Sequence, residues 1–251
     1  MRILFLTLAF SLSVAAASAQ EFTSGSARVP LLELYTSEGC SSCPPADRWL
    51  SSLKNDQRLW KEFVPVSFHV DYWNYLGWDD RFAKASSGTR QRDYKYQGYS
   101  AGVYTPGVML AGIEWRSWRR GKVPSLVSED AAGSLQLRVD GERFTASFIQ
   151  NTQQKTNSPR LHIALIGMGL KSEVRAGENQ GKELNHDFVV LDSLSMDPSS
   201  LGTSNALWRG ILPSAPLKSE AQQLAVAAWI SDGDDLQPQQ AVGGWLHPGS
   251  P

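Results

Sequence analysis

Residues 28–56 read RVPLLELYTSEGCSSCPPADRWLSSLKND and contain both cysteines of the 251-residue chain. The dense apolar run around Leu34 predicts a short buried strand. The two prolines that follow Cys43 suit the first turn of a helix, because the backbone N–H that proline lacks has no helical partner there. The motif Cys40-Ser41-Ser42-Cys43 therefore lies between a predicted strand and a predicted helix.

A cysteine pair at the start of a helix has the features of a thioredoxin-type redox pair. Thiol–disulfide exchange needs a thiolate at ambient pH and a second thiol that resolves the mixed disulfide. The free N–H groups and the positive dipole end of a helix favour the thiolate of the first cysteine. We therefore expect Cys40 to be the exposed catalytic nucleophile and Cys43 to be the more buried, resolving thiol.

Two other interpretations of the pair stay open at this point. A disulfide across two residues closes a very small loop and stabilises little, which disfavours a purely structural crosslink. Structural zinc needs four ligands, and the chain has only two thiols. A copper site of Cys40, Cys43 and His69 is the metal alternative, because thiolates and imidazole suit copper. The other alternative is a cysteine pair without catalytic activity.

Three polar residues in predicted strands are candidates to assist the thiols. Glu33 lies between apolar neighbours upstream of the motif, and a carboxylate there would relay the proton of the buried cysteine. The alternative for Glu33 is a surface position on an edge strand. His69 and Asp71 share one face at the end of the strand-like run 63–73. This pair would tune the thiols, act as a ligand, or be purely structural.

Two further groups of side chains have open interpretations. Arg90 belongs to a basic helical stretch, 84–98, which is either a solvated face or a source of positive charge near the thiols. Trp73 belongs to an aromatic group that packs in the core or forms an apolar rim for a partner. The chain contains no nucleotide-binding or metalloprotease motif, so no cofactor is predicted.

The first 19 residues have the features of a signal peptide. Arg2 precedes an apolar run, 3–16, and Ala17-Ser18-Ala19 matches the small-x-small pattern of a cleavage site. The run is shorter than the roughly 18 residues that a spanning helix needs. We expect cleavage before Gln20, a periplasmic or extracellular protein, and no membrane contact in the mature form. The net charge of −1 gives no reason to expect nucleic acid as a partner.

The sequence pattern changes near residue 130. Before it, predicted strands alternate with helices, which is typical of an α/β architecture with an appended hairpin. From residue 134 onward, short alternating segments separated by turn signals predict a compact β-rich domain. The expected organisation is an α/β domain over 27–130 followed by a β-rich, sandwich-like domain over 134–247.

Several long segments resemble a family of exported bacterial proteins, domain of unknown function 1223. They are LELYTSEGCSSCPPAD (32–47), SFHVDYWNYLGWDDRFA (67–83), TRQRDY (89–94), VYTPGVMLAG (103–112) and RAGENQGKELNHDFVV (175–190). The resemblance implies a thioredoxin-like fold for the N-terminal domain and brings no substrate with it. In thioredoxin-like proteins a cis-proline loop faces the cysteines and binds substrate, so a cis bond and substrate contact are implied for Thr105 and Pro106.

The sequence thus predicts an exported, thioredoxin-like thiol–disulfide oxidoreductase that acts on a protein or on a small thiol or disulfide. The alternative is a copper- or protein-binding module that uses the same Cys and His residues without turnover. The polar, glycine-rich segment 177–187 predicts either a hairpin turn or a docking loop that covers the cysteine site from the second half of the chain.

Overall fold

The computed structural model describes residues 19–121, 123–124, 132–151 and 156–247. Strands dominate these ranges, which hold two α-helices, α1 (Pro44–Ser52) and α2 (Ala85–Tyr96). The expected signal peptide lies outside the described residues, apart from Ala19. No helix in the described ranges is long and apolar enough to cross a bilayer.

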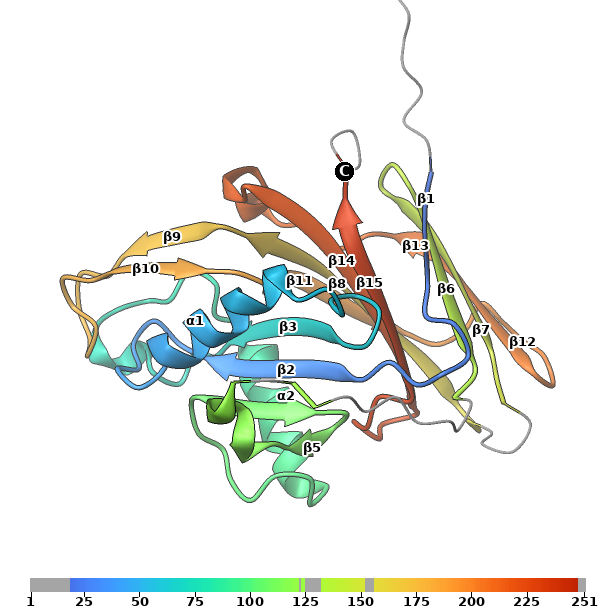
Figure 1. The fold of residues 1–251 in the computed structure, drawn as a ribbon, viewed down its shortest axis with the longest axis horizontal. Coiled ribbons are helices and arrows are strands. Elements are labelled where there is room, and N and C mark those ends of the chain that lie inside the picture. Colours follow the sequence, from blue (N-terminus) through green and yellow to red (C-terminus); the bar gives the residue numbers. More distant parts are fainter. Residues whose placement is uncertain (1–18, 122, 125–131, 152–155, 248–251) are drawn as a thin grey trace, which may run out of the picture.

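The described strands form three sheets (Figure 1). The larger sheet contains, in spatial order, β15 (Gln240–Leu246), β14 (Gln223–Asp232), β8 (Pro159–Met168), β11 (Val189–Met196), β3 (Val64–His69), β2 (Leu31–Thr36), β4 (Gly107–Leu110) and β5 (Ile113–Glu114). The second sheet contains β1 (Gln20–Thr23), β6 (Ser134–Asp140), β7 (Arg143–Ile149), β13 (Asn205–Ile211) and β12 (Ser200–Leu201). The third is a hairpin of β9 (Leu170–Glu173) and β10 (Glu183–His186). Short 3-10 helices lie at Leu53–Asn55, Asn74–Leu76, Arg116–Arg120 and Pro216–Glu220.

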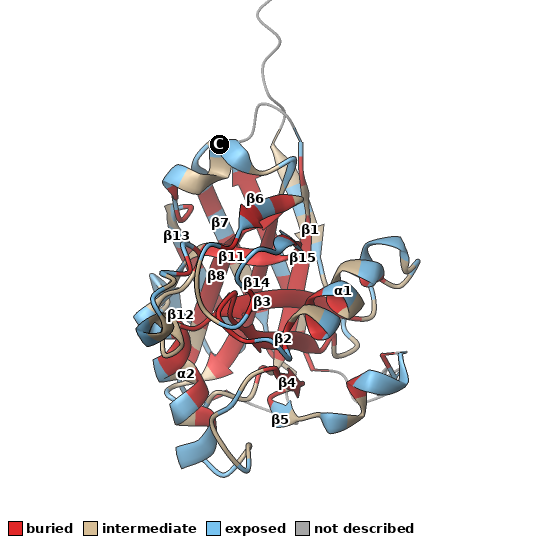
Figure 2. Cartoon of the chain, turned by 90° about the vertical axis from the view of Figure 1, so that its left-hand side faces the viewer, coloured by how far each residue is buried: buried red, intermediate tan, exposed pale blue. Residues whose placement is uncertain are grey.

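The second sheet packs on one face of the larger sheet. Leu137 and Trp208, from the second sheet, share a buried cluster with Ile163 and Val226 of β8 and β14. The other face of β8 and β14 contributes to a second core, in which Trp229 packs with residues of β2 and β3. The central strands are therefore buried on both faces, as the red strands in the middle of Figure 2 show. This two-layer packing is sandwich-like.

The expected fold class, a thioredoxin-like α/β domain followed by a separate β-rich part, is wrong, because the protein has a β-sandwich-like fold. β3 pairs in parallel with β2 on one side and with β11 on the other, where Val189 lies opposite Ser67. The strands before residue 130 thus continue into the sheet built by the later strands. A buried run such as VPVSFH (64–69) needs strand neighbours, but its apolar pattern does not say which strands supply them. Residues 125–131, which include the expected end of the first domain, lie outside the described ranges.

The strand, helix and strand predicted around the cysteines are present as β2, α1 and β3. β2 and β3 run parallel, from Leu31 opposite Val64 to Thr36 opposite His69. Successive side chains along a strand point to opposite faces. Glu33 points toward α2, where Arg90 donates to it, whereas Thr36 points to the face that carries Asp47 of α1. The two helices therefore contact opposite faces of β2.

Candidate functional site

The two cysteines form a disulfide at the N-terminus of α1. Cys40 and Cys43 have Cα atoms 5.5 Å apart, and Cys43 is the N-cap residue, directly before two prolines in the first turn. The carbonyl oxygen of Cys43 accepts hydrogen bonds from the N–H groups of Ala46 and Asp47, at 2.8 and 3.1 Å. The predicted position of the motif, between a strand and a helix that begins with proline, is confirmed.

Both cysteine side chains are buried in this disulfide-bonded structure. Cys40 is 1% exposed and Cys43 is 0% exposed, so the expectation of an exposed Cys40 is not met. The Sγ atom of Cys40 nevertheless lies 3.3 Å from the hydroxyl of Ser42, an exposed residue. Cys40 is thus the member of the pair next to the surface, and Cys43 is the member covered by α1.

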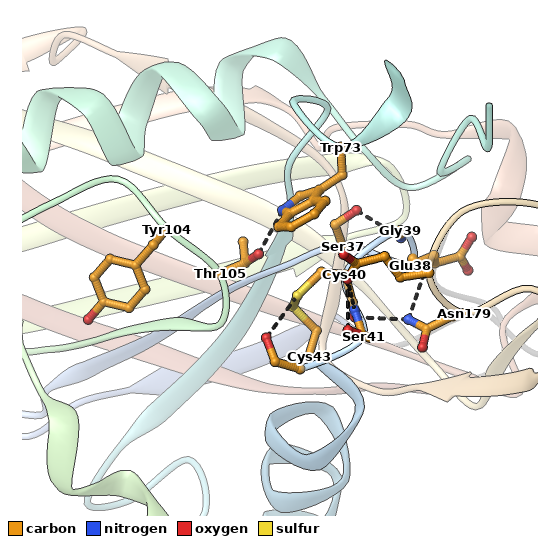
Figure 3. Close-up of a disulfide and its surroundings, with 12 residues drawn as sticks. Ser37, Glu38, Gly39, Cys40, Ser41, Cys43, Trp73, Tyr104, Thr105 and Asn179 are labelled. Atoms are coloured by element: carbon orange, nitrogen blue, oxygen red, sulfur yellow. Dashed lines mark hydrogen bonds between the residues drawn. A yellow bond between two sulfur atoms is a disulfide. The ribbon is translucent and has the colours of Figure 1, made fainter. Parts of the chain in front are cut away.

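Trp73 and the loop before β4 close one side of the disulfide (Figure 3). The Trp73 indole N–H donates to the Thr105 hydroxyl at 2.8 Å, and the Thr105–Pro106 peptide bond is cis, as the family resemblance implies. Gly39 lies against Trp73, because a Cβ on Gly39 would come within 3.1 Å of the Trp73 Cβ. Trp73 is therefore part of this site. It is half-buried, so it both packs against the core and borders the site.

The β9–β10 hairpin docks on the other side of the motif. The side-chain amide of Asn179 donates to the carbonyl oxygens of Glu38 and Cys40, at 2.9 and 2.8 Å. The carboxylate of Glu178 accepts hydrogen bonds from the backbone N–H and the hydroxyl of Ser41, at 2.9 and 2.7 Å. Segment 177–187 is both a hairpin connection and a docking loop. Its density of polar residues was the signal in the sequence, but the contact joins residues about 140 positions apart.

The structure does not bring Glu33 together with the cysteines. Glu33 is fully buried on the α2 face of β2, where Arg90 donates to it at 2.8 and 3.1 Å. The hydroxyls of Tyr35 and Tyr94 also donate to this carboxylate. The Arg90 side chain is only 12% exposed, so the interpretation as a solvated helix face is wrong for this residue. Glu33 and Arg90 form a buried, hydrogen-bonded ion pair on the opposite face of β2 from α1.

His69 and Asp71 do not act as a pair either. The Nδ1 atom of His69 lies 2.7 Å from a carboxylate oxygen of Asp80, and both side chains are fully buried. Asp71 lies instead beside α2, where a Cβ added to Gly88 would come within 3.3 Å of its carboxylate. The chain turns after β3, so the two-residue alternation of a strand no longer holds at Asp71.

Sequence reasoning missed a buried polar cluster behind the disulfide. Glu38 accepts a hydrogen bond from the Trp78 indole at 2.7 Å, and its other carboxylate oxygen lies 3.2 Å from the Nε2 atom of His186, on β10. The rings of His186 and His69 pack edge to face, with centroids 4.9 Å apart. Asp47, on α1, is 7% exposed and lies near both imidazoles and Thr36. The one feature of the sequence that could have indicated this cluster is the spacing of Cys43 and Asp47, which lie one helical turn apart.

Burial and neighbouring charges shift the pKa values of the groups in this cluster in different directions. Burial raises the pKa of Asp47, which favours its neutral acid. Burial by itself would lower the pKa of His69, but the charge and hydrogen bond of Asp80 outweigh it and raise that pKa. Burial would raise the pKa of Asp80, and the same imidazole outweighs it and lowers that pKa. These directions favour a neutral Asp47 beside a charged His69–Asp80 pair.

The described residues supply no set of three or more His, Cys, Asp or Glu side chains suited to a metal ion. His69 turns one ring nitrogen to Asp80, and both sulfurs are bonded to each other. The copper alternative therefore gains no ligand set from this part of the chain.

The fold and the site define a β-sandwich-like protein with a buried Cys-x-x-Cys disulfide. The chain belongs to a protein family of unknown function, DUF1223, whose model matches residues 31–230. No curated protein matches the sequence.

Two solved structures are similar in fold. A crystal structure of a protein from Agrobacterium tumefaciens has 23% sequence identity and a TM-score of 0.56, with 89% of this chain and 96% of that chain covered. HBP35 of Porphyromonas gingivalis has 12% identity and a TM-score of 0.62, with 90% of this chain and 77% of that chain covered. At these identities the similarity concerns the fold alone.

Proposed function

We propose that this protein is an exported thiol–disulfide oxidoreductase that exchanges electrons with a protein or a small thiol through Cys40 and Cys43. The observation that carries the proposal is the Cys40–Cys43 disulfide at the N-terminus of α1. A thiolate released there meets free backbone N–H groups and the positive end of the helix dipole. Since these are the chain's only cysteines, the disulfide has no other thiol in the chain with which to exchange.

The reaction consists of two exchanges at sulfur. A substrate thiolate attacks the Sγ atom of Cys40, the bond to Cys43 breaks, and its electron pair leaves on the Cys43 sulfur, which takes up a proton. A second substrate thiolate then attacks the substrate sulfur of the mixed disulfide and releases Cys40 as a thiolate. The substrate loses two electrons and becomes a disulfide, and the enzyme gains them as a dithiol. The reverse sequence reduces a substrate disulfide.

Cys40 is the attacked atom in this proposal because it lies next to exposed Ser42, while α1 begins at Cys43. We assign substrate contact to Thr105, which lies on the same side of the disulfide as Trp73 (Figure 3), and to Pro106, which follows it through a cis peptide bond. The surroundings of Cys40 have to open before a substrate sulfur reaches it, since Cys40 is 1% exposed.

Export is part of the same proposal. The features of residues 1–19 support cleavage before Gln20, and β1 begins at Gln20, so cleavage there would leave every described strand intact. An exported dithiol also avoids the reducing pool of the cytosol. Mass spectrometry of the protein after expression of the full gene in a bacterial host would identify the N-terminus and the compartment. A cytosolic chain with residues 1–19 intact would contradict export.

The redox activity is tested with the purified mature protein. We would measure the reduction potential of the cysteine pair and the turnover of a model disulfide peptide, for wild type, Cys40→Ser and Cys43→Ser. We expect Cys40→Ser to abolish turnover, and Cys43→Ser to accumulate a mixed disulfide because nothing resolves it. Reduced wild-type protein with alkylated thiols is the control. Turnover that survives Cys40→Ser would overturn the proposal, as would stoichiometric, cysteine-dependent binding of Cu(I) without any turnover.

A further inference from the structure

The buried cluster behind the disulfide suggests how the pair is supplied with protons, an inference that rests on the proposed redox function. We propose that Asp47 donates the proton to Cys43 when the disulfide is reduced, and that the His69–Asp80 and His186–Glu38 pairs stabilise the carboxylate that remains. The cluster draws on both halves of the chain, since His186 belongs to β10.

Asp47 is positioned for this transfer by the helix that Cys43 begins. The two residues are one turn apart on the same face of α1, the backbone N–H of Asp47 donates to the Cys43 carbonyl, and both side chains are buried. A buried sulfur that leaves as a thiolate without a proton would carry an unpaired charge in a low-dielectric site. Glu33 does not meet this need, because it lies on the other face of β2 and is held by Arg90.

The proton balance follows from the states of the cluster. Burial raises the pKa of Asp47, which favours its neutral acid, and the proposed transfer starts from that acid in the disulfide form. When the Cys40–Cys43 bond breaks, the electron pair on Cys43 takes the Asp47 proton, and Asp47 becomes a carboxylate. In the opposite direction Asp47 takes the proton back from Cys43, so that the resolving thiolate forms. No other oxidant or reductant than the substrate is needed.

The two imidazoles stabilise the new negative charge. The charges of His186 and His69 lower the pKa of Asp47 against the larger effect of burial. Asp80 acts in the opposite sense on Asp47, but the 2.7 Å bond to His69 compensates its charge. The carboxylate of Glu38 lies 3.2 Å from the Nε2 atom of His186 and accepts a hydrogen bond from the Trp78 indole. Asp187, which follows His186, is paired with Lys54 at 2.7 Å.

The test measures the reduction of the disulfide by dithiothreitol at a series of pH values from about 5 to 9, corrected for the thiolate fraction of the reductant. In wild type we expect the corrected rate to fall as Asp47 loses its proton. Asp47→Asn, which keeps the shape and removes the acid, should be slower at low pH by at least about tenfold and independent of pH. Asp197→Asn is the matched control, because Asp197 is a surface carboxylate that is 75% exposed.

A second measurement uses the wild-type protein and therefore does not depend on whether the Asp47→Asn variant folds. Infrared difference spectra of the wild type, oxidised minus reduced, should contain the band of a protonated carboxylic acid that is lost on reduction. Absence of that band would overturn the inference, as would an Asp47→Asn protein that has the wild-type rate and pH profile. Because dithiothreitol is the only reductant, this result is independent of substrate turnover. A protein without turnover but with a slowed Asp47→Asn variant would refute the proposed function alone.

Discussion

At the residue scale, the site has two buried acids with different environments on the two faces of β2. Glu33 accepts hydrogen bonds from Arg90 and two tyrosines, so its charge is fully compensated. Asp47 lies on the other face, close to Thr36 and the imidazoles. The first arrangement stabilises a fixed ion pair, whereas the second can release and take up a proton. Which acid lies on the same side of β2 as the cysteine helix is therefore decided by the face of the strand and not by distance along the chain.

We expect Glu33→Gln to lower the free energy of unfolding by about 3 kcal/mol, because it leaves the largely buried Arg90 without its counter-charge. The rate of disulfide reduction in the remaining folded protein should stay at the wild-type value. Urea unfolding followed by circular dichroism measures the first quantity. Glu21→Gln is the control, since the Glu21–Arg138 pair is 51% exposed on each side and should contribute less than about 1 kcal/mol. If Glu33→Gln were as stable as wild type but its disulfide were reduced slowly, Glu33 and not Asp47 would be the proton donor.

The His69–Asp80 pair makes stability depend on pH. The pKa of His69 is raised on folding, so its contribution is complete below the unfolded value of about 6.5 and is lost as the pH rises through the folded value. The lowered pKa of Asp80 gives stability that is lost only in acid. We expect urea midpoints to fall as the pH is raised above about 6.5, and Asp80→Asn to flatten that slope. An unchanged slope in Asp80→Asn would assign the pH dependence to other groups.

At the element scale, the β9–β10 hairpin completes a site that β2 and α1 begin. Asn179 satisfies the carbonyl oxygens of Glu38 and Cys40, and β10 contributes His186 to the buried cluster. Gly177 has a φ of 77° and lies close to Gly39, where an added Cβ would be 3.6 Å from its Cα atom. The two glycines let the hairpin tip approach the cysteine loop.

We expect Asn179→Ala to cost about 1–3 kcal/mol of stability, because the buried amide hydrogen bonds to the carbonyl oxygens of Glu38 and Cys40 are lost and Cys40 is left with the N–H of Cys43 as donor. The loss should be local, so amide hydrogen exchange around residues 38–43 should accelerate more than exchange in β8 and β14. Asn185→Ala is the matched control, since Asn185 is exposed on the same hairpin. Equal exchange in the two variants would mean that the hairpin does not hold the cysteine loop.

At the scale of the whole molecule, the cysteine unit, which consists of β2, α1 and β3, belongs to the interior of the larger sheet, where β3 and β2 lie between β11 and β4. β2 and β3 share their core with Ala164, Ile166 and Trp229, and β1 pairs with β6, where Gln20 lies opposite Val139. The early strands thus bury their apolar faces against strands that are synthesised much later. Such non-local pairings tie the folding of the cysteine unit to the rest of the chain.

We therefore expect the fragment 27–130 to be unfolded when it is expressed alone, because β3 would lose β11 and the core behind it. The mature chain should unfold in a single transition, with coincident changes in near- and far-ultraviolet circular dichroism. A well-dispersed NMR spectrum of the fragment would contradict this and would support the boundary expected between residues 130 and 134.

Some of the site follows from local sequence. The apolar run 31–36, the prolines after Cys43 and the cysteine spacing predict the strand, the helix and the redox pair, because each depends on neighbours a few residues away. The cis bond at Thr105–Pro106 followed from the family resemblance. By contrast, the hydrogen bond from Asn179 to the carbonyl oxygen of Cys40 joins residues 139 positions apart, which no local pattern predicts.

The sequence by itself determined the local unit of strand, cysteine pair and helix, since propensity, proline geometry and spacing act within a few residues. Only the tertiary structure decided the fold class, the partners of Glu33 and His69, and the cluster of Asp47, His69 and His186. These features require the parallel pairing of β3 with β11 and the docking of β9–β10. The apolar pattern of a strand specifies that the strand is buried but not which distant strand buries it. Buried charges, in turn, are compensated only where that strand pairing brings their partners together.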